Sequence, residues 1–377
     1  MRVAIVTESF LPQLNGVTNS VLRVLETLKQ REHEALVIAP SAPSSLHLGF
    51  PVVSAGAIPV MQFPVAVPRP QVSKTLEEFR PDVIHVAAPF MLGAQALSWG
   101  KRNNVPTVAI YQTDVAGYLA RYNLNFARPA MERALVAIHS QADLNLAPTP
   151  QSAQYLESLG IPNVSVWGRG VDLDLFNPAR KEASEVFKRR QTLVPGGELL
   201  VGFVGRLASE KQVHRMAELF DIPGLRFLVV GDGPERERLE REFAGKPVTF
   251  TGALSGLDLA HAYAALDIFV HFGTEETFGQ TIQEAQATGL PVVAPASGGP
   301  LHLIDSGRTG LLVDHSIGSY RRAVAGLVDS QRRELIGANA LAAVANRSWS
   351  RNNSRLLDYY VQAGAQERRS FARFELA

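Results

Sequence analysis

The chain of 377 residues contains no cysteine. This absence excludes disulfide bonds, zinc sites with thiolate ligands, iron–sulfur clusters and a cysteine nucleophile. The motifs GxxxxGK[ST], GxSxG and HExxH and the calcium loop of EF-hands are also missing, so no P-loop, hydrolase elbow or zinc-protease helix is indicated. The nine histidines have no ligand spacing, and we interpret His271, in an expected strand, as a core residue. We therefore expect no metal and no cofactor.

The chain has little net charge. Lys and Arg number 37 and Asp and Glu 36, which gives a formal charge of +1. Such a balance provides no bulk attraction to nucleic acid, and we expect no nucleic-acid partner. Hydrophobic residues make up 46% and charged residues 19% of the chain, a composition typical of globular proteins.

Long hydrophobic runs are missing too. The apolar run Val3–Val6 is too short for the hydrophobic part of a signal peptide and predicts a first strand. We therefore expect a cytoplasmic protein. The segment from Ala35 to Pro68 has no Asp, Glu, Lys or Arg, but it contains six prolines. Because proline breaks helices, we expect no transmembrane helix there.

Short apolar, β-branched runs alternate with helical patterns along the chain. Runs such as Phe227–Val230 are continuously apolar, which is typical of parallel strands buried on both faces. Strands are expected at Val3–Thr7, Ala35–Ala39, Val52–Ala55, Val83–Ala87, Thr107–Tyr111, Leu144–Pro148, Val164–Trp167, Leu199–Val204, Leu225–Val230, Val248–Thr251, Ile268–His271, Pro291–Ala294 and Gly310–Val313. Helices are expected at Val17–Arg31, Phe90–Arg102, Phe126–His139, Glu210–Phe220, Glu235–Phe243, Leu257–Leu266 and Thr281–Ala287.

This alternation predicts an α/β protein with two doubly wound, Rossmann-like domains. We place the domains at residues 1–170 and 171–345, and expect a last helix within 346–377 to pack back on the first domain. The tail after Gly364 is expected to fray. Ligands of such sheets bind beyond the carboxyl ends of the strands, so a deep cleft between the two domains is expected.

Three segments follow expected strands and contain residues suited to an anionic ligand. Gly16 opens the first helix, whose N-terminus suits a phosphate, although Asn15 could simply cap that helix. Arg206 and Lys211 follow a buried strand and could neutralise a diphosphate; solvated surface cations are the alternative.

In the third segment, Glu276 lies in a loop and Glu284 in the helix that follows it. The backbone N–H groups of Gly279 to Thr281 would point at an anion, while the two carboxylates would grip sugar hydroxyls. An acidic first helical turn is the alternative. Two weaker signals are Tyr111–Asp114 and the glycine turn Ala296–Pro300, for which ordinary turn chemistry is the alternative.

Together these motifs resemble the retaining glycosyltransferases of family 4, which have the GT-B fold. The resemblance covers about the whole chain and rests on Gly16, on Val204–Leu207 with Lys211, on Val230–Pro234, on Glu276 to Glu284 and on Gly298–Pro300. Within the family, Thr7–Pro12 and Tyr111–Tyr118 look most like actinobacterial GDP-mannose-dependent mannosyltransferases that act on glycolipids. Sulfoquinovosyl- and glucosyl-diacylglycerol synthases, which use UDP-sugars, look similar.

The resemblance implies a role for each matching residue. Arg206 and Lys211 would bind the donor diphosphate with Gly16 beside it, Glu276 would hold the donor sugar, and Glu284 the ribose. Backbone donors would come from Phe278, Gly279, Gln280 and Thr281. It places Asp114 with Arg206, Lys211 and Glu276 as catalytic residues, and Gln112, Thr113 and Asn15 at the acceptor or sugar. Many relatives have histidine where Gln112 stands; glutamine cannot donate a proton in acid–base catalysis, but it can bind a hydroxyl.

The implied reaction is transfer of a hexose from a nucleotide-sugar with retention and without a metal. The first alternative is a UDP-sugar-dependent glycosyl- or sulfoquinovosyl-diacylglycerol synthase. A nucleotide-sugar epimerase and a non-catalytic sugar-binding protein are the further alternatives. We expect a lipid acceptor and peripheral contact with the inner membrane surface, because Ile58–Pro68 reads as a loop exposing apolar side chains and Arg69 and Lys74 follow it. A loop packed on its own domain is the alternative.

Overall fold

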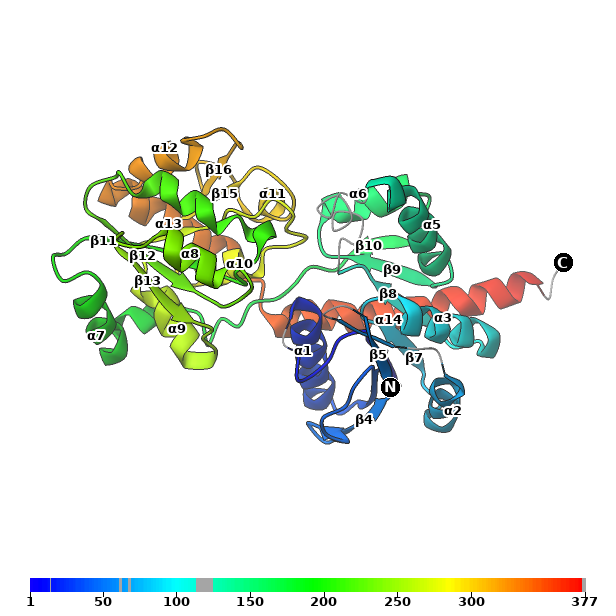
Figure 1. Cartoon of the computed structure of the whole chain (residues 1–377). Coiled ribbons are helices and arrows are strands. Elements are labelled where there is room, and N and C mark those ends of the chain that lie inside the picture. The colour runs from blue at the N-terminus through cyan, green and yellow to red at the C-terminus, as the bar shows by residue number, and fades with distance from the viewer. Residues whose placement is uncertain (14, 61–62, 67–68, 113–124, 375–377) are drawn as a thin grey trace. The chain divides into compact units, whose positions relative to one another are not determined.

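The computed structural model describes residues 1–13, 15–60, 63–66, 69–112 and 125–374. It divides into two compact units: residues 1–169 with 349–377 form unit 1, and residues 170–348 form unit 2. Each unit is built on its own parallel sheet with helices packed against it (Figure 1). The two doubly wound sheets predicted from the sequence are therefore confirmed.

The sheet of unit 1 has eight strands in the order β10-β9-β8-β7-β1-β2-β4-β3. All neighbours run parallel except β3 and β4. Its strands are β1 (Arg2–Val6), β2 (Glu34–Ala39), β3 (Leu46–His47), β4 (Phe50–Ser54), β7 (Val83–Val86), β8 (Thr107–Ile110), β9 (Leu144–Ala147) and β10 (Val164–Val166). Its helices are α1 (Gly16–Gln30), α2 (Pro70–Phe79), α3 (Met91–Asn103), α5 (Arg128–His139), α6 (Pro150–Ser158) and α14 (Trp349–Phe374), with the 3-10 helix η1 (Asn125–Ala127).

Strand β1 shows why its sequence is apolar throughout. Val3 and Ile5 point into a cluster with α1 and α14, whereas Ala4 and Val6 point into a second cluster with α2 and α3. Because both faces of the strand are covered, alternation with polar residues is not expected. Helix α14 contributes Tyr360 to the first cluster and so belongs to unit 1, although it is last in the chain.

The sheet of unit 2 has six parallel strands in the order β13-β12-β11-β14-β15-β16. They are β11 (Leu199–Val204), β12 (Leu225–Val230), β13 (Val248–Gly252), β14 (Ile268–Val270), β15 (Val292–Pro295) and β16 (Leu311–Val313). The helices are α7 (Ser184–Leu193), α8 (Arg236–Glu242), α9 (Gly256–Ala265), α10 (Gln280–Ala287), α11 (Pro300–Leu303), α12 (Ser319–Ala325) and α13 (Ser330–Val344), with the 3-10 helices η2 (Pro178–Glu182), η3 (Ser209–Lys211) and η4 (Val213–Leu219).

The structure corrects three expectations. The expected loop at Ile58–Pro68 contains a hairpin of β5 (Ala57–Val60) and β6 (Phe63–Ala66), in which Pro59 lies opposite Pro64. A two-stranded sheet has only edge strands, where a missing N–H can face away from the partner. The helix expected at Glu210–Phe220 is split into η3 and η4 by Gln212, whose φ is 48°.

The third correction concerns the tail. We expected fraying after Gly364, but α14 continues as helix to Phe374; the Ala, Gln, Glu and Arg residues of this stretch favour helix. No helix within the described ranges combines the length and apolarity needed to span a membrane.

Candidate active site

The loops at the carboxyl edge of the unit 2 sheet pack together through glycines. A Cβ atom on Gly231 would lie 1.9 Å from the carbonyl oxygen of Gly205, and one on Gly233 would lie 2.3 Å from that of Leu207. The Leu207 N–H donates to the Asp232 carbonyl at 2.9 Å. The turn after β11 therefore lies directly on the turn after β12, and its Arg206 is exposed.

A second pair of glycines fixes the loop after β14. A Cβ atom on Gly298 would lie 2.5 Å from the Glu276 carbonyl oxygen, and one on Gly299 would lie 2.2 Å from the Phe278 carbonyl oxygen. The Gly299 N–H donates to the Glu276 carbonyl at 2.6 Å, and the Ser297 hydroxyl donates to the Thr274 carbonyl at 2.9 Å. The weak sequence signal at Ala296–Pro300 thus marks a turn that supports the loop carrying Glu276.

Lys211 and Glu276, which are far apart in the sequence, meet in this edge. Lys211 Nζ lies 2.6 Å from Glu276 Oε2, and both side chains are mostly buried. The imidazole Nε2 of His271 lies 3.6 Å from the same carboxylate oxygen. A partly buried cation and a carboxylate in contact can bind a phosphate and a hydroxyl side by side.

Helix α10 begins beside this pair. Its N-cap is Gly279, with φ 96°, and the first N–H groups of a helix have no partner within the helix. Phe278 is 3% exposed and its ring packs in the core, so only its backbone could contact a ligand. One turn into α10, Glu284 Oε2 accepts from the Tyr263 hydroxyl at 2.9 Å. Burial and the Glu284 charge hold the pKa of Tyr263 well above its ordinary value, so this hydroxyl stays a donor.

In unit 1, Asn15 caps helix α1. Its Oδ1 accepts from the N–H groups of Val17 and Thr18 at 3.0 Å, and its Nδ2 donates to the Ser9 hydroxyl at 2.6 Å. The cap that the sequence offered as an alternative role for Asn15 is therefore present. A Cβ atom on Gly16 would lie 2.8 Å from Arg169 Nη1.

The side chain of Gln112 is held at both ends. Its Nε2 donates to the Ala87 carbonyl at 2.7 Å, and its Oε1 accepts from Arg169 Nη2 at 2.8 Å. Gln112 thus connects the end of β7 to the guanidinium that covers Gly16. Thr113 and Asp114 lie outside the described residues. Sequence reasoning missed Arg169; its signal is that it follows β10, and so reaches the edge to which Gln112 belongs.

Glu8 is a second residue that the sequence reasoning missed. Its Oε1 accepts from the N–H groups of Leu92 and Gly93, at 2.6 and 3.1 Å, at the start of α3. Burial raises the pKa of Glu8 to about 7, although these backbone donors act in the opposite direction. The only signal in the sequence is an acidic residue directly after the first strand.

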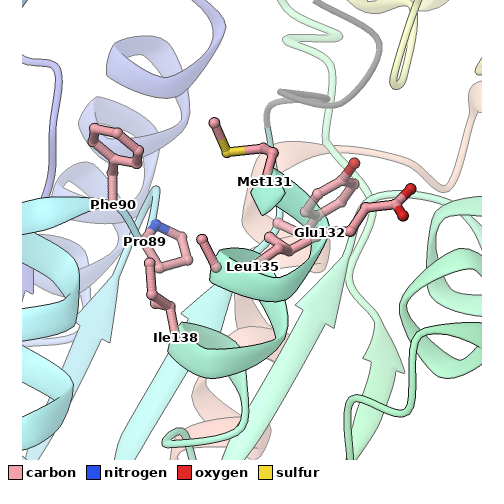
Figure 2. Close-up of a pocket in the computed structure, with 8 residues that line it drawn as sticks. Pro89, Phe90, Met131, Glu132, Leu135 and Ile138 are labelled. Carbon is pink, nitrogen blue, oxygen red and sulfur yellow. The ribbon is translucent and has the colours of Figure 1, made fainter. Parts of the chain in front are cut away.

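Unit 1 also contains an apolar pocket at the carboxyl ends of β7 and β8. Figure 2 shows Pro89 and Phe90 facing the helix α5, along which Met131, Leu135 and Ile138 are spaced. The pocket is completed by Tyr111, Glu132 and Ala134. The Glu132 carboxylate forms an ion pair with Arg128 at 2.8 Å and accepts from the Tyr155 hydroxyl. These contacts hold its charge with polar partners, whereas most of the pocket lining is apolar. In the described part of the chain, no group of three or more His, Asp or Glu side chains is placed to hold a metal ion.

Known protein families match both units of the chain. The family model described as Glycosyltransferase Family 4 matches residues 14–175, and the one described as Glycosyl transferases group 1 matches residues 185–341. A solved sucrose-phosphate synthase from Thermosynechococcus elongatus superposes with a TM-score of 0.81 at 22% identity, covering 97% of this chain and 99% of that one. The fold is therefore GT-B, and the protein is a glycosyltransferase.

Several relatives of this chain are glycosyltransferases whose sugar donor is named. GDP-mannose-dependent alpha-mannosyltransferases of Corynebacterium glutamicum and Mycobacterium tuberculosis are 42% and 44% identical to this chain. The first match covers 98% of this chain and 91% of the relative, and the second covers 96% of each. A GDP-mannose-dependent alpha-(1-6)-phosphatidylinositol dimannoside mannosyltransferase of M. tuberculosis is 30% identical over 81% of this chain and 83% of its own length. The chain belongs to glycosyltransferase family 4.

Proposed function

We propose that this enzyme transfers mannose from GDP-mannose, with retention of configuration, to a lipid or glycolipid acceptor at the cytoplasmic face of the membrane. The observation that carries the proposal is the identity of 42–44%, over nearly the whole chain, to relatives named as GDP-mannose-dependent alpha-mannosyltransferases. The contact between Lys211 and Glu276 at the carboxyl edge of unit 2 supports it, because a donor of this kind presents phosphate and sugar hydroxyls together.

In this proposal Arg206 and Lys211 bind the donor diphosphate, together with the backbone N–H groups of Phe278 to Thr281. Glu276 holds the mannose, and Glu284 holds the ribose hydroxyls. The Tyr263 hydroxyl donates to one Glu284 oxygen at 2.9 Å and so orients this carboxylate. Gly16, at the start of α1, is kept beside the diphosphate, and Asp114 is retained as a catalytic candidate.

The acceptor hydroxyl forms a bond to the anomeric carbon as the bond from that carbon to the phosphate oxygen breaks. The hydroxyl proton passes to the leaving phosphate, so the products are the mannosylated acceptor and GDP. Negative charge that develops on the diphosphate is stabilised by the cations Arg206 and Lys211. The step draws on no metal.

The lipid acceptor is supported by two observations. One relative is named for a phosphatidylinositol dimannoside, and unit 1 has an apolar pocket between the start of α3 and α5, which suits a hydrocarbon part of an acceptor. We place peripheral membrane contact at the β5–β6 hairpin and at Arg69 and Lys74, of which Lys74 is exposed.

The donor is tested by thermal shift with GDP, UDP and ADP, because a ligand that binds only the folded state raises its stability. GDP is expected to stabilise the protein most. Stabilisation by UDP that equals or exceeds that by GDP would contradict the proposed donor while leaving the family untouched.

The site is tested by Arg206→Ala, Lys211→Ala and Glu276→Ala. Each is expected to lower kcat/KM by at least ~10²-fold, the scale for losing one group that stabilises transition-state charge. Arg308→Ala, at an exposed arginine of the same unit, is the matched control. Wild-type turnover in a folded Lys211→Ala protein would count against the site.

Membrane contact is tested by co-sedimentation with vesicles that contain anionic lipid. Met61→Asp/Phe63→Asp and Arg69→Glu/Lys74→Glu are each expected to bind less than the wild type, because apolar insertion and basic contact both contribute to such binding. Equal partitioning of all three folded proteins would show that this surface does not face the lipid.

A further inference from the structure

His271 is a buried polar group in the donor site. Its side chain is 2% exposed, and within the described residues neither ring nitrogen makes a hydrogen bond of good geometry, although the ring lies close to the Gly273 backbone. An unmade hydrogen bond of a buried group costs about 1–3 kcal/mol, and buried groups of this kind are few in folded proteins. The sequence interpretation of His271 as an ordinary core residue does not account for this cost.

The His271 ring is held firmly in place. Its backbone N–H donates to the Val293 carbonyl at 2.9 Å, and its carbonyl accepts from the Tyr320 hydroxyl at 2.8 Å. The imidazole stacks on Phe203, with ring centroids 6.4 Å apart and planes 20° apart. His271 directly follows β14 at the carboxyl edge of the sheet, so its position is fixed by the sheet, whereas Glu276 lies on the loop that follows.

The imidazole is neutral at ordinary pH. Burial lowers the pKa of His271 to about 4. The Lys211 charge acts in the same direction, whereas the Glu276 carboxylate and the Gly273 backbone act in the opposite direction. A neutral imidazole has one N–H and one bare nitrogen. Since Nε2 is the atom 3.6 Å from Glu276 Oε2, a proton on Nε2 faces an acceptor, and we assign that tautomer.

We propose that His271 is a positioning residue for Glu276: its Nε2–H donates to the carboxylate and holds it toward the donor sugar when Lys211 binds the diphosphate. The inference rests on the proposed donor site. In the structure Lys211 Nζ shares the same carboxylate oxygen at 2.6 Å. In this proposal a diphosphate competes with Glu276 for that ammonium, and the His271 Nε2–H is the donor that stays beside the carboxylate, at 3.6 Å.

The role predicts an effect on the sugar but not on the nucleotide. His271→Phe keeps an aromatic ring on Phe203 and removes the N–H, whereas His271→Gln keeps an N–H donor. We expect His271→Phe to weaken GDP-mannose about tenfold relative to GDP, on the scale of one hydrogen bond to a charged group, and His271→Gln to restore part of that preference. His271→Leu, which also lacks the N–H, replaces the Phe variant if that does not fold.

The experiment is calorimetric titration of each variant with GDP and with GDP-mannose, repeated in a Glu276→Gln background. His261→Gln is the matched control, because His261 is buried on α9 in the same unit, beside Glu185. Support requires that the selectivity change of His271→Phe shrinks once Glu276 is replaced, since coupled residues are not additive.

A structural role alone gives a different result. An equal loss for GDP and GDP-mannose, or the same selectivity change in both backgrounds, overturns the proposal. UDP and UDP-glucose are titrated in parallel. If the wild type binds only the uridine compounds, the proposed donor is refuted, and the His271 role is decided on that pair of ligands by the same two criteria.

Discussion

Replacing Gly299 by alanine tests whether the turn after β15 supports the donor loop. Gly299 has φ −56° and ψ −37°, a conformation that alanine adopts freely, so the substitution acts only through space. The new Cβ would lie 2.2 Å from the Phe278 carbonyl oxygen and 2.7 Å from the Phe278 Cα. An ordinary contact begins near 3.4 Å, so the Phe278 backbone must move by about 1 Å.

That displacement moves the backbone donors at the start of α10. Loss of one hydrogen bond to a charged phosphate costs about 1.5–3 kcal/mol, which corresponds to roughly 10- to 100-fold weaker binding. We therefore expect Gly299→Ala to raise the Kd for GDP by that factor in a calorimetric titration, with a cooperative thermal transition retained.

Gly326→Ala is the control. Its Cβ would meet the end of the flexible Arg332 side chain at 2.8 Å and otherwise only atoms at ordinary distances, so GDP binding should stay at the wild-type value. Unchanged GDP affinity in a folded Gly299→Ala protein would refute the reasoning, because the crowded carbonyl would then not control the donor loop.

Three further predictions concern unit 1. Since the pKa of Glu8 is raised to about 7, folding binds a proton between pH 4.5 and 7, and the free energy of unfolding should fall as pH rises through that window. In urea titrations at pH 5 and pH 8, Glu8→Gln should reduce this fall by up to about 3 kcal/mol. The same fall in the variant and the wild type would contradict the prediction. Gly16→Ala and Gln112→Leu both displace Arg169, so each should lower kcat/KM about tenfold, and full additivity in the double variant would argue against a shared route. Leu135→Asp places a charge in the apolar pocket and should raise the KM for a lipid acceptor while GDP binding stays unchanged; an unaffected acceptor KM would remove the pocket from the acceptor site.

The buried parallel strands were predictable because their composition reports their surroundings. Strand β12 is apolar at nearly every position, and the structure covers both of its faces. The β5–β6 hairpin was not predictable in this way, since Pro59 and Pro64 argue against a strand unless its edges are free. Helix α2, which begins at Pro70, was also not predicted, although proline is tolerated in a first helical turn.

The sequence predicted individual site residues on single loops, but not the contacts between them. Lys211 and Glu276 were each found because each follows a buried strand, but their contact at 2.6 Å depends on how neighbouring strands are ordered in the sheet. The Arg169 guanidinium donates to Gln112, and these two residues follow different strands of unit 1, β10 and β8. No spacing in the sequence predicts this hydrogen bond. Pairwise contacts between distant segments are therefore what the sequence alone could not supply.

The position of α14 has a consequence for synthesis of the chain. Unit 2 is one uninterrupted segment, and its two ends are joined by a bridge between Val171 and Ser348 and by a hydrogen bond of 2.8 Å from the Val171 N–H to the Arg347 carbonyl. Unit 1 needs Leu356 and Tyr360 of α14 to complete a core that begins at Val3. On the ribosome, where domains fold as they emerge, the second unit can therefore finish folding before the first. The amino-terminal sheet, with α1 already on this face, stays incompletely covered until α14 leaves the exit tunnel.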